Sequence, residues 1–187
     1  MPSRIVLAGG VQKSDSVFEI GAGCGTLTRA LAEVGCPVVA LEYDRDLVPV
    51  ARAELSWADH VDIREGNVLD VNWPELSEEL DGPLVVYGNL PYHLSSPIIF
   101  GLLENPSSWR RACFMLQWEF AQRLAAEPGT RQSSALSVQA SLWAHTVLLF
   151  PVPARSFHPP PKVESAIVVM ERRSKPAADV GDAKDFK

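Results

Sequence analysis

Asn89, Leu90, Pro91 and Tyr92 form the segment whose residue types best suit chemistry on a ligand. They follow the apolar run Leu84 to Gly88, which is typical of a buried strand. The side-chain carbonyl of Asn89 can accept a hydrogen bond from the exocyclic amine of a planar base, and Pro91 fixes the backbone so that a neighbouring carbonyl can accept a second. Tyr92 offers a face on which the ring can stack. The segment also fits an ordinary turn, since Asn and Pro are common turn residues.

A glycine-rich loop, Glu19 to Gly25, lies between a short apolar run and a segment with helical spacing. Its glycines allow a tight turn and a close approach of a ligand to the backbone. Glu19 lies just inside the strand, where an acid is a poor core residue without a function. Glu42 ends the next strand, about 20 residues downstream, where an acid that binds ribose is expected. A purely structural glycine turn is the alternative.

The order of residues in this loop discriminates between two cofactors. A dinucleotide loop has the pattern Gly-x-Gly-x-x-Gly, which would require a glycine where Thr26 stands. The sequence Glu-x-Gly-x-Gly-x-Gly is nearer to the S-adenosylmethionine pattern. This cofactor carries no pyrophosphate that needs a helix N-terminus, and Glu19 would repel one. The loop therefore favours S-adenosylmethionine over a nicotinamide dinucleotide.

A second amide, Asn67, closes the third strand after Gly66, where it could meet the adenine of the cofactor or simply form an Asn turn. The carboxyl ends of parallel strands line one crevice, so we expect these motifs to converge there. The predicted cofactor-binding residues are Glu19, Gly21, Ala22, Gly23, Gly25, Glu42, Tyr43, Asn67, Val68 and Asn89.

The elements that must position these residues alternate between strand and helix patterns. The predicted strands are 17–20, 38–41, 61–63, 84–87 and 112–116, and the predicted helices are 26–34, 46–57, a helix from about Ser95, 118–126 and 133–143. Two further strands, 146–152 and 163–170, are joined by a proline-rich loop without a helix, which predicts an antiparallel pair. The pattern is typical of an α/β fold with a doubly wound, mostly parallel sheet that ends in this antiparallel pair. We expect one domain over residues 1–171, followed by a polar, disordered tail over 172–187.

The composition excludes several classes of protein. The chain has 187 residues, 47% of them hydrophobic, which suffices for one core, and its formal charge is −6, which does not favour a general electrostatic grip on nucleic acid. Three scattered cysteines and four histidines show no ligand spacing, so we predict neither disulfides nor a metal. No run reaches the roughly 18 apolar residues of a membrane span, and the first ten residues are too short for a signal core. We expect a cytoplasmic monomer that does not bind membranes.

Taken together, these segments resemble the rRNA adenine N6-dimethyltransferase family, to which the erythromycin-resistance methyltransferases are related. The similarity runs from about Ile5 to Met170. Its segments are 19–28, 41–44, 88–97, 117–124, 134–139 and 157–166. The last contains Phe-His-Pro-Pro-Pro-Lys-Val-Glu-Ser-Ala, which a general S-adenosylmethionine enzyme would not need.

The resemblance implies a Rossmann-like methyltransferase fold and the transfer of two methyl groups, in succession, from S-adenosylmethionine to the N6 of adenosines in ribosomal RNA. The usual substrate is the small ribosomal subunit, near the 3′ end of its RNA. Catalytic roles are implied for Asn89, Leu90, Pro91 and Tyr92, and for Phe157 as a second aromatic. Hydrogen bonds from N6 to the Asn89 side chain and the Leu90 carbonyl would favour a tetrahedral nitrogen that can attack the methyl group.

The sequence departs from the family pattern in several places. The Gln-Asn-Phe-Leu segment of the relatives and most of their helical C-terminal domain have no counterpart here, so we expect weaker binding of cofactor and RNA. Asn67 stands where Asp is usual, and Trp118 where Lys is common. Asn67 can still present an oxygen to the adenine amine, whereas Trp118 removes a positive charge from the expected RNA face.

Three alternatives remain at the level of the sequence. A methyltransferase for DNA adenine or for a glutamine side chain usually carries a Pro where Leu90 stands, which counts against it. A large-subunit rRNA methyltransferase of the macrolide-resistance type would share the motifs. A non-catalytic ribosome-assembly factor would share the RNA partner without turnover.

Overall fold

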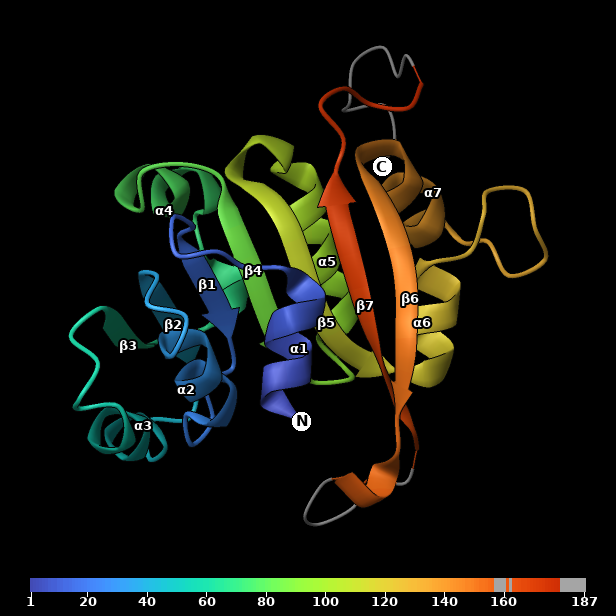
Figure 1. The fold of residues 1–187 in the computed structure, drawn as a ribbon. Helices are drawn as coiled ribbons and strands as arrows, with labels where there is room; N and C mark the ends of the chain where they lie inside the picture. Colours follow the sequence, from blue (N-terminus) through green and yellow to red (C-terminus); the bar gives the residue numbers. More distant parts are fainter. Residues whose placement is uncertain (157–160, 162, 179–187) are drawn as a thin grey trace.

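A seven-stranded sheet between two layers of helices forms the core of the fold (Figure 1). The structure is a computed structural model that describes residues 1–156, 161 and 163–178. Its strands are β1 (Val17–Ile20), β2 (Val38–Glu42), β3 (Val61–Glu65), β4 (Leu84–Asn89), β5 (Trp109–Gln117), β6 (Ala144–Val152) and β7 (Ser165–Arg172). The α-helices are α1 (Pro2–Gly9), α2 (Thr26–Ala32), α3 (Val48–Glu54), α4 (Trp73–Glu79), α5 (Ser95–Glu104), α6 (Trp118–Leu124) and α7 (Ala135–Trp143). Short 3-10 turns follow β3 (η1, Val68–Asp70), α5 (η2, Pro106–Ser108) and β6 (η3, Ala154–Ser156).

The strand order is β3-β2-β1-β4-β5-β7-β6. Neighbouring strands from β3 to β5 are parallel, whereas β7 runs antiparallel to both β5 and β6. The arrow of β7 accordingly points opposite to those of β1 and β6 in Figure 1. The predicted doubly wound, mostly parallel sheet with a terminal antiparallel pair is confirmed. The structure adds that β7 enters between β5 and β6.

Two hydrophobic cores, one on each face of the sheet, hold the layers together. One core packs α4, α5, α6 and α7 against strand residues such as Phe18, Val86 and Phe114. The other packs α1, α2 and α3 against residues such as Val17, Val85 and Ile167. All four residues of β1 and the first five of β4 are buried, as expected for parallel strands that are covered on both faces.

Several element boundaries differ from the sequence prediction. The pattern predicts nothing between Ile63 and Leu84, whereas η1 and α4 lie there. Helix α4 is short, and its signal is local: Asn72 accepts a hydrogen bond from the Glu75 N–H at 3.4 Å, and a proline lies in the first turn. Helix α5 begins at Ser95, as predicted, and its N-cap, Leu94, makes no side-chain cap bond.

The first residues of the predicted tail, 172–178, include the last residue of β7 and make backbone hydrogen bonds to α7. Arg172 belongs to β7, and the backbone N–H groups of Arg173 and Ala177 donate to carbonyls at the end of α7. Residues 179–187 lie outside the described residues. Within residues 1–156, 161 and 163–178, no helix is long and apolar enough to cross a membrane.

Candidate active site at the carboxyl edge of the sheet

The sheet reverses its winding between β1 and β4, and such a reversal is where a crevice is expected in an open α/β sheet. β1 and β4 are parallel neighbours, with Ile20 opposite Gly88. The chain leaves β1 towards α2 on one face and leaves β4 towards α5 on the other. Ligands of open α/β sheets bind at such a switch point, outside the carboxyl ends of the strands. The two predicted motifs, the glycine loop and the Asn89 segment, therefore begin side by side.

The glycine loop has a backbone that requires glycine. Gly21, Gly23 and Gly25 have φ values of 78°, 55° and 82°, in the left-handed region. A Cβ atom added to Gly21 would lie 3.9 Å from the carbonyl oxygen of Asn89, whereas one added to Gly23 would meet nothing within 4 Å. The Gly23 backbone thus faces open space, and the Gly21 backbone borders the Asn89 segment.

Glu42 is tied to the glycine loop. Its Oε2 accepts the Gly23 N–H at 2.6 Å, and its Oε1 accepts the Asp44 N–H at 2.8 Å. The two bonds orient a carboxylate that is only 8% exposed at the end of β2. Each oxygen keeps a second lone pair for a ligand hydroxyl.

Glu19 lies deeper, within β1. It is 1% exposed, and its Oε2 has no hydrogen-bond partner among the described residues. Burial raises the pKa of Glu19 to about 8; the neighbouring Thr28 hydroxyl opposes this shift and the negative charge of Glu42 adds to it. An uncharged or partly charged carboxyl at neutral pH lies below the loop, so Glu42 is the better placed of the two acids for direct ligand contact.

The segment after β4 is held by its backbone and leaves its ligand-binding atoms open. The Leu90 N–H donates to the Met115 carbonyl at 3.2 Å, and the Leu90 side chain is 1% exposed. The Pro91 carbonyl accepts the Leu94 N–H and the Ser95 hydroxyl, both at 3.0 Å. Among the described residues, neither the Asn89 side-chain amide nor the Leu90 carbonyl has a hydrogen-bond partner.

The remaining predicted residues differ in their exposure and in their hydrogen bonds. Tyr43 is 78% exposed and Tyr92 is 42% exposed, so both rings can receive a ligand. The Asn67 Oδ1 accepts the Leu69 N–H at 3.1 Å and caps η1, in which Val68 is half-buried. This leaves the Asn67 amide nitrogen without a partner among the described residues. Phe157 lies outside the described residues.

Three supporting contacts were missed by the reasoning from sequence. Ser95 and Met115 fix the backbone of the Asn89 segment, and Thr28 lies beside Glu19. A serine four residues after Pro91 is a local signal that could have been read. Met115 and Thr28 lie in other elements than the residues they contact, so no local sequence pattern indicates these contacts.

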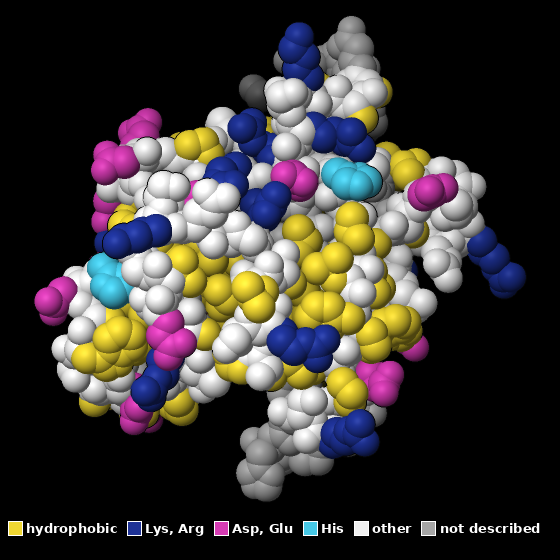
Figure 2. Space-filling model, viewed as in Figure 1, with side chains coloured by type: hydrophobic (Ala, Val, Ile, Leu, Met, Phe, Trp, Pro, Cys, Tyr) yellow, Lys and Arg dark blue, Asp and Glu magenta, His cyan; other side chains and the backbone are white. Residues whose placement is uncertain are grey.

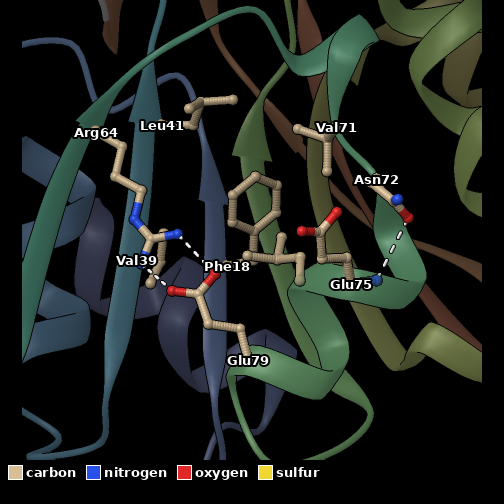
Figure 3. Close-up of a pocket in the computed structure, with 9 residues that line it drawn as sticks. Phe18, Val39, Leu41, Arg64, Val71, Asn72, Glu75 and Glu79 are labelled. Atoms are coloured by element: carbon tan, nitrogen blue, oxygen red, sulfur yellow. Dashed lines mark hydrogen bonds and ion pairs between the residues drawn. The ribbon is translucent and has the colours of Figure 1, made fainter.

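A separate pocket of about 200 Å³ lies between α4 and the face of β1, β2 and β3 (Figure 3). Its floor is apolar, with Phe18, Val39 and Leu41, and on one side Arg64 donates to Glu79 at 3.0 Å. None of the predicted cofactor-binding residues lines it. The predicted site lies instead at the carboxyl ends of β1, β2 and β4.

Comparison with known proteins decides the family. The sequence profile of the family described as ribosomal RNA adenine dimethylase matches residues 2–187. The chain belongs to this family. The adenine dimethylase fold is shared by two solved structures, a dimethyladenosine transferase from Plasmodium falciparum (TM-score 0.81, 29% identity, 92% of this chain and 61% of that one) and the 23S rRNA methyltransferase ErmE (TM-score 0.83, 29% identity, 95% and 69%).

Relatives of this chain in sequence include the ribosomal RNA small subunit methyltransferase A of Magnetococcus marinus. It is 40% identical over 183 residues, which cover 98% of this chain and 66% of that protein. The chain spans 58% to 66% of the length of eight curated relatives with this name.

Proposed function

We propose that this protein transfers methyl groups from S-adenosylmethionine to the N6 of adenosines in ribosomal RNA. The observation that carries the proposal is the contact between its two motifs: the Gly21 backbone borders the Asn89 carbonyl at the switch point of the sheet. A cofactor held by the glycine loop would therefore lie beside a base held by the Asn89 segment. Such proximity is what a methyl transfer in line requires.

The residues of the crevice fit S-adenosylmethionine. Gly23 presents open backbone, Glu42 presents two oriented oxygens for ribose hydroxyls, and Tyr43 and Val68 offer apolar surface for the adenine. Glu19 lies buried below the loop and would be the second acid beside a bound cofactor. When bound, the cofactor supplies an electrophilic methyl group on a sulfonium centre, whose departure as a neutral thioether needs no metal.

The Asn89 segment acts on the target base. The N6 lone pair of adenine is conjugated into the ring and is a weak nucleophile. In the first transfer, hydrogen bonds from N6 to the Asn89 Oδ1 and to the Leu90 carbonyl favour a tetrahedral nitrogen whose lone pair is free to attack. The monomethylated nitrogen of the second transfer can donate to one of these acceptors at a time. After each transfer the methylated nitrogen releases one proton to the solvent. Both acceptors are unpartnered among the described residues, and the Tyr92 ring is exposed for stacking. The base must leave its stack to reach them. Phe157 is the proposed second aromatic.

We propose the small ribosomal subunit as substrate and partner, two adjacent adenosines near the 3′ end of its RNA as targets, and a monomer as the active form. The names of the curated relatives support the choice of the small subunit. A large-subunit rRNA is the second candidate. The 23S rRNA methyltransferase ErmE matches this chain in sequence identity and TM-score as well as the dimethyladenosine transferase from Plasmodium falciparum does.

Transfer of labelled methyl groups to undermethylated subunits tests the proposal. Purified small and large subunits from a strain that lacks this modification are incubated separately with labelled S-adenosylmethionine, and the modified nucleotides are mapped by mass spectrometry. We expect N6,N6-dimethyladenosine in the small subunit only. Label in the large subunit alone would establish the second candidate.

An Asn89→Ala variant is the matched control. Asn89 is exposed and its side chain makes no bond among the described residues, so its removal should leave the melting temperature unchanged. Transfer should fall at least about 100-fold, because an acceptor for the reacting nitrogen is lost. Absence of transfer by the wild-type chain, with intact binding to subunits, would instead support the assembly-factor alternative.

A further inference from the structure

Five cations lie at the end of the sheet opposite the crevice. This basic edge consists of Arg110 and Arg111 at the start of β5, Arg172 at the end of β7, and Arg173 and Lys175 just beyond it. The strand register places Arg111 and Arg172 at the same level of the sheet, because Arg111 lies opposite Glu171, the residue before Arg172. The backbone N–H of Arg173 donates to the Trp143 carbonyl at 2.8 Å and fixes the chain after β7.

Carboxylates neutralise only part of the basic edge. Arg110 is paired with Asp15, and the Arg111 Nη2 lies 2.7 Å from the Glu171 Oε1. The hydrogen bond from Arg111 is the main cause that lowers the pKa of Glu171, and the charges of His145 and Arg110 add to it. Arg172, Arg173 and Lys175 have no carboxylate within ion-pair distance among the described residues. The surface therefore keeps an excess of positive charge.

This local excess contrasts with the formal charge of the whole chain, which is −6. Figure 2 shows Lys and Arg side chains grouped near the top of the view, where β7 ends, around a single acidic side chain and a histidine. A polyanion can therefore bind at this positive surface, although it is repelled by the net negative charge of the whole protein.

The side chains of the basic edge favour a phosphate backbone over other anionic partners. Four of the five are arginines, whose planar guanidinium groups pair with phosphate through two hydrogen bonds. None of the large exposed hydrophobic side chains of the described residues lies in segments 109–111 or 171–175. Stacked single-stranded bases and protein interfaces usually require such aromatic or apolar contacts. A duplex, whose phosphates face outward, does not.

The basic edge is also separated from the crevice by a defined distance. Asn89 is level with Met115, which is level with Ile167, and Arg172 follows five residues later on β7. At about 3.3 Å per residue the separation along the strand is about 17 Å. A flipped adenosine alone cannot reach that far, whereas a neighbouring helix of a folded RNA can.

We propose that the basic edge binds the phosphate backbone of a double-stranded RNA segment that flanks the methylated adenosines. This inference rests on the proposed function, since it assigns a second contact to the same substrate. The basic edge would raise the affinity for structured RNA without contributing to the chemical step.

Charge-removal variants of the full 187-residue chain test the proposal. The triple variant Arg172→Gln, Arg173→Gln and Lys175→Gln removes the three cations that have no carboxylate partner among the described residues, although the Arg173 Nε donates to the Ser141 carbonyl at 3.1 Å. The matched control, Arg29→Gln, Arg123→Gln and Arg131→Gln, removes the same charge from exposed positions outside the basic edge. Binding to a protein-free RNA duplex of about 16 base pairs, a length that a double-stranded RNA domain covers, is measured over a range of salt concentrations.

We expect the triple variant to bind the duplex at least about tenfold more weakly at low salt, and its slope of log affinity against log salt to be smaller by about 2–3. The control should keep both values. With small subunits, the triple variant should show a raised KM for methyl transfer and an unchanged kcat.

Two outcomes would overturn the proposal. One is an unchanged affinity and salt slope, or an equal loss in the control. The other is a loss of subunit binding in the triple variant when the wild-type chain does not bind the protein-free duplex, because the partner would then be a ribosomal protein. These results differ from failure of the proposed function, in which the wild-type chain transfers no methyl group to any rRNA.

Discussion

At Tyr92, a substitution should weaken binding of the target base without changing the stability of the fold. Its ring is 42% exposed and should contribute by stacking. Loss of one base–aromatic stack is worth about 1–3 kcal/mol, so Tyr92→Ala should lower kcat/KM roughly 5- to 150-fold. Tyr92→Phe keeps the ring and should retain most activity in the same methyl-transfer assay. If Tyr92→Phe loses as much as Tyr92→Ala, the hydroxyl rather than the ring carries the function.

Glu19 should give the protein a specific pH dependence of stability. Because burial raises the pKa of Glu19 from 4.5 to about 8, the folded state holds a proton that the unfolded state has released between these values. The free energy of unfolding should therefore fall as pH rises through this range. Glu19→Gln stays neutral, so its stability advantage over the wild type should grow with pH, by a few kcal/mol at most.

Thermal unfolding at several pH values between about 5 and 8.5 measures the effect of Glu19 as the difference between wild type and variant. Glu33→Gln, at an exposed carboxylate in a surface ion pair, serves as the control and should parallel the wild type. Parallel curves for Glu19→Gln and wild type would show that Glu19 is charged throughout.

At the scale of the element, β4 can carry the Asn89 segment only if Gly88 has no side chain. An added Cβ would lie 2.8 Å from the Leu90 Cδ2 and 3.0 Å from the Ile20 carbonyl oxygen. Gly88→Ala should therefore push β4 away from β1, lower stability by about 1–3 kcal/mol, and reduce methyl transfer because the crevice is distorted.

Gly101 provides the matched control for Gly88→Ala within α5. A Cβ added there would meet its nearest neighbour, the Trp73 Nε1, at 3.5 Å, an ordinary contact. Gly101→Ala should stabilise the protein by about 0.5–1 kcal/mol, because alanine is the better helix residue. Denaturant titration of both variants checks the pair, and equal effects would contradict the steric argument.

At the scale of the whole molecule, cofactor binding should stabilise the entire fold. Saturation at about 100 times Kd adds about 2.7 kcal/mol, which for a chain of this size raises Tm by about 5–10 °C. Gly23→Ala should abolish most of this shift, because its methyl group would occupy the open space in front of the loop.

Gly129→Ala is the control for Gly23→Ala, because it distinguishes the effect of backbone strain from the effect of lost cofactor binding. Both glycines have positive φ and would place a Cβ in open space, so both variants should lose a similar 1–2 kcal/mol without cofactor. Only Gly129→Ala should retain the full shift of Tm with S-adenosylmethionine. A full shift in Gly23→Ala would remove the glycine loop from the proposed site.

The sequence by itself determined the class of fold, the motifs and the strand ends that carry them. Glycines, apolar runs and capping residues act locally, through φ preferences and hydrogen-bond periodicity, so their spacing along the chain is enough to predict them. Residues 1–171 remain our proposal for the catalytic domain. Helix α4 was not predicted from the sequence, because only a few of its residues are buried and its start depends on one capping residue.

The tertiary structure alone decided which of these motifs meet, and how. It placed β1 beside β4, so that the glycine loop borders Asn89, and it showed that Glu19 is buried with a raised pKa while Glu42 faces the loop. It also brought Arg111 and Arg172, 61 positions apart in the chain, onto one edge. Burial and strand register are properties of packing between distant segments, and no local pattern records them.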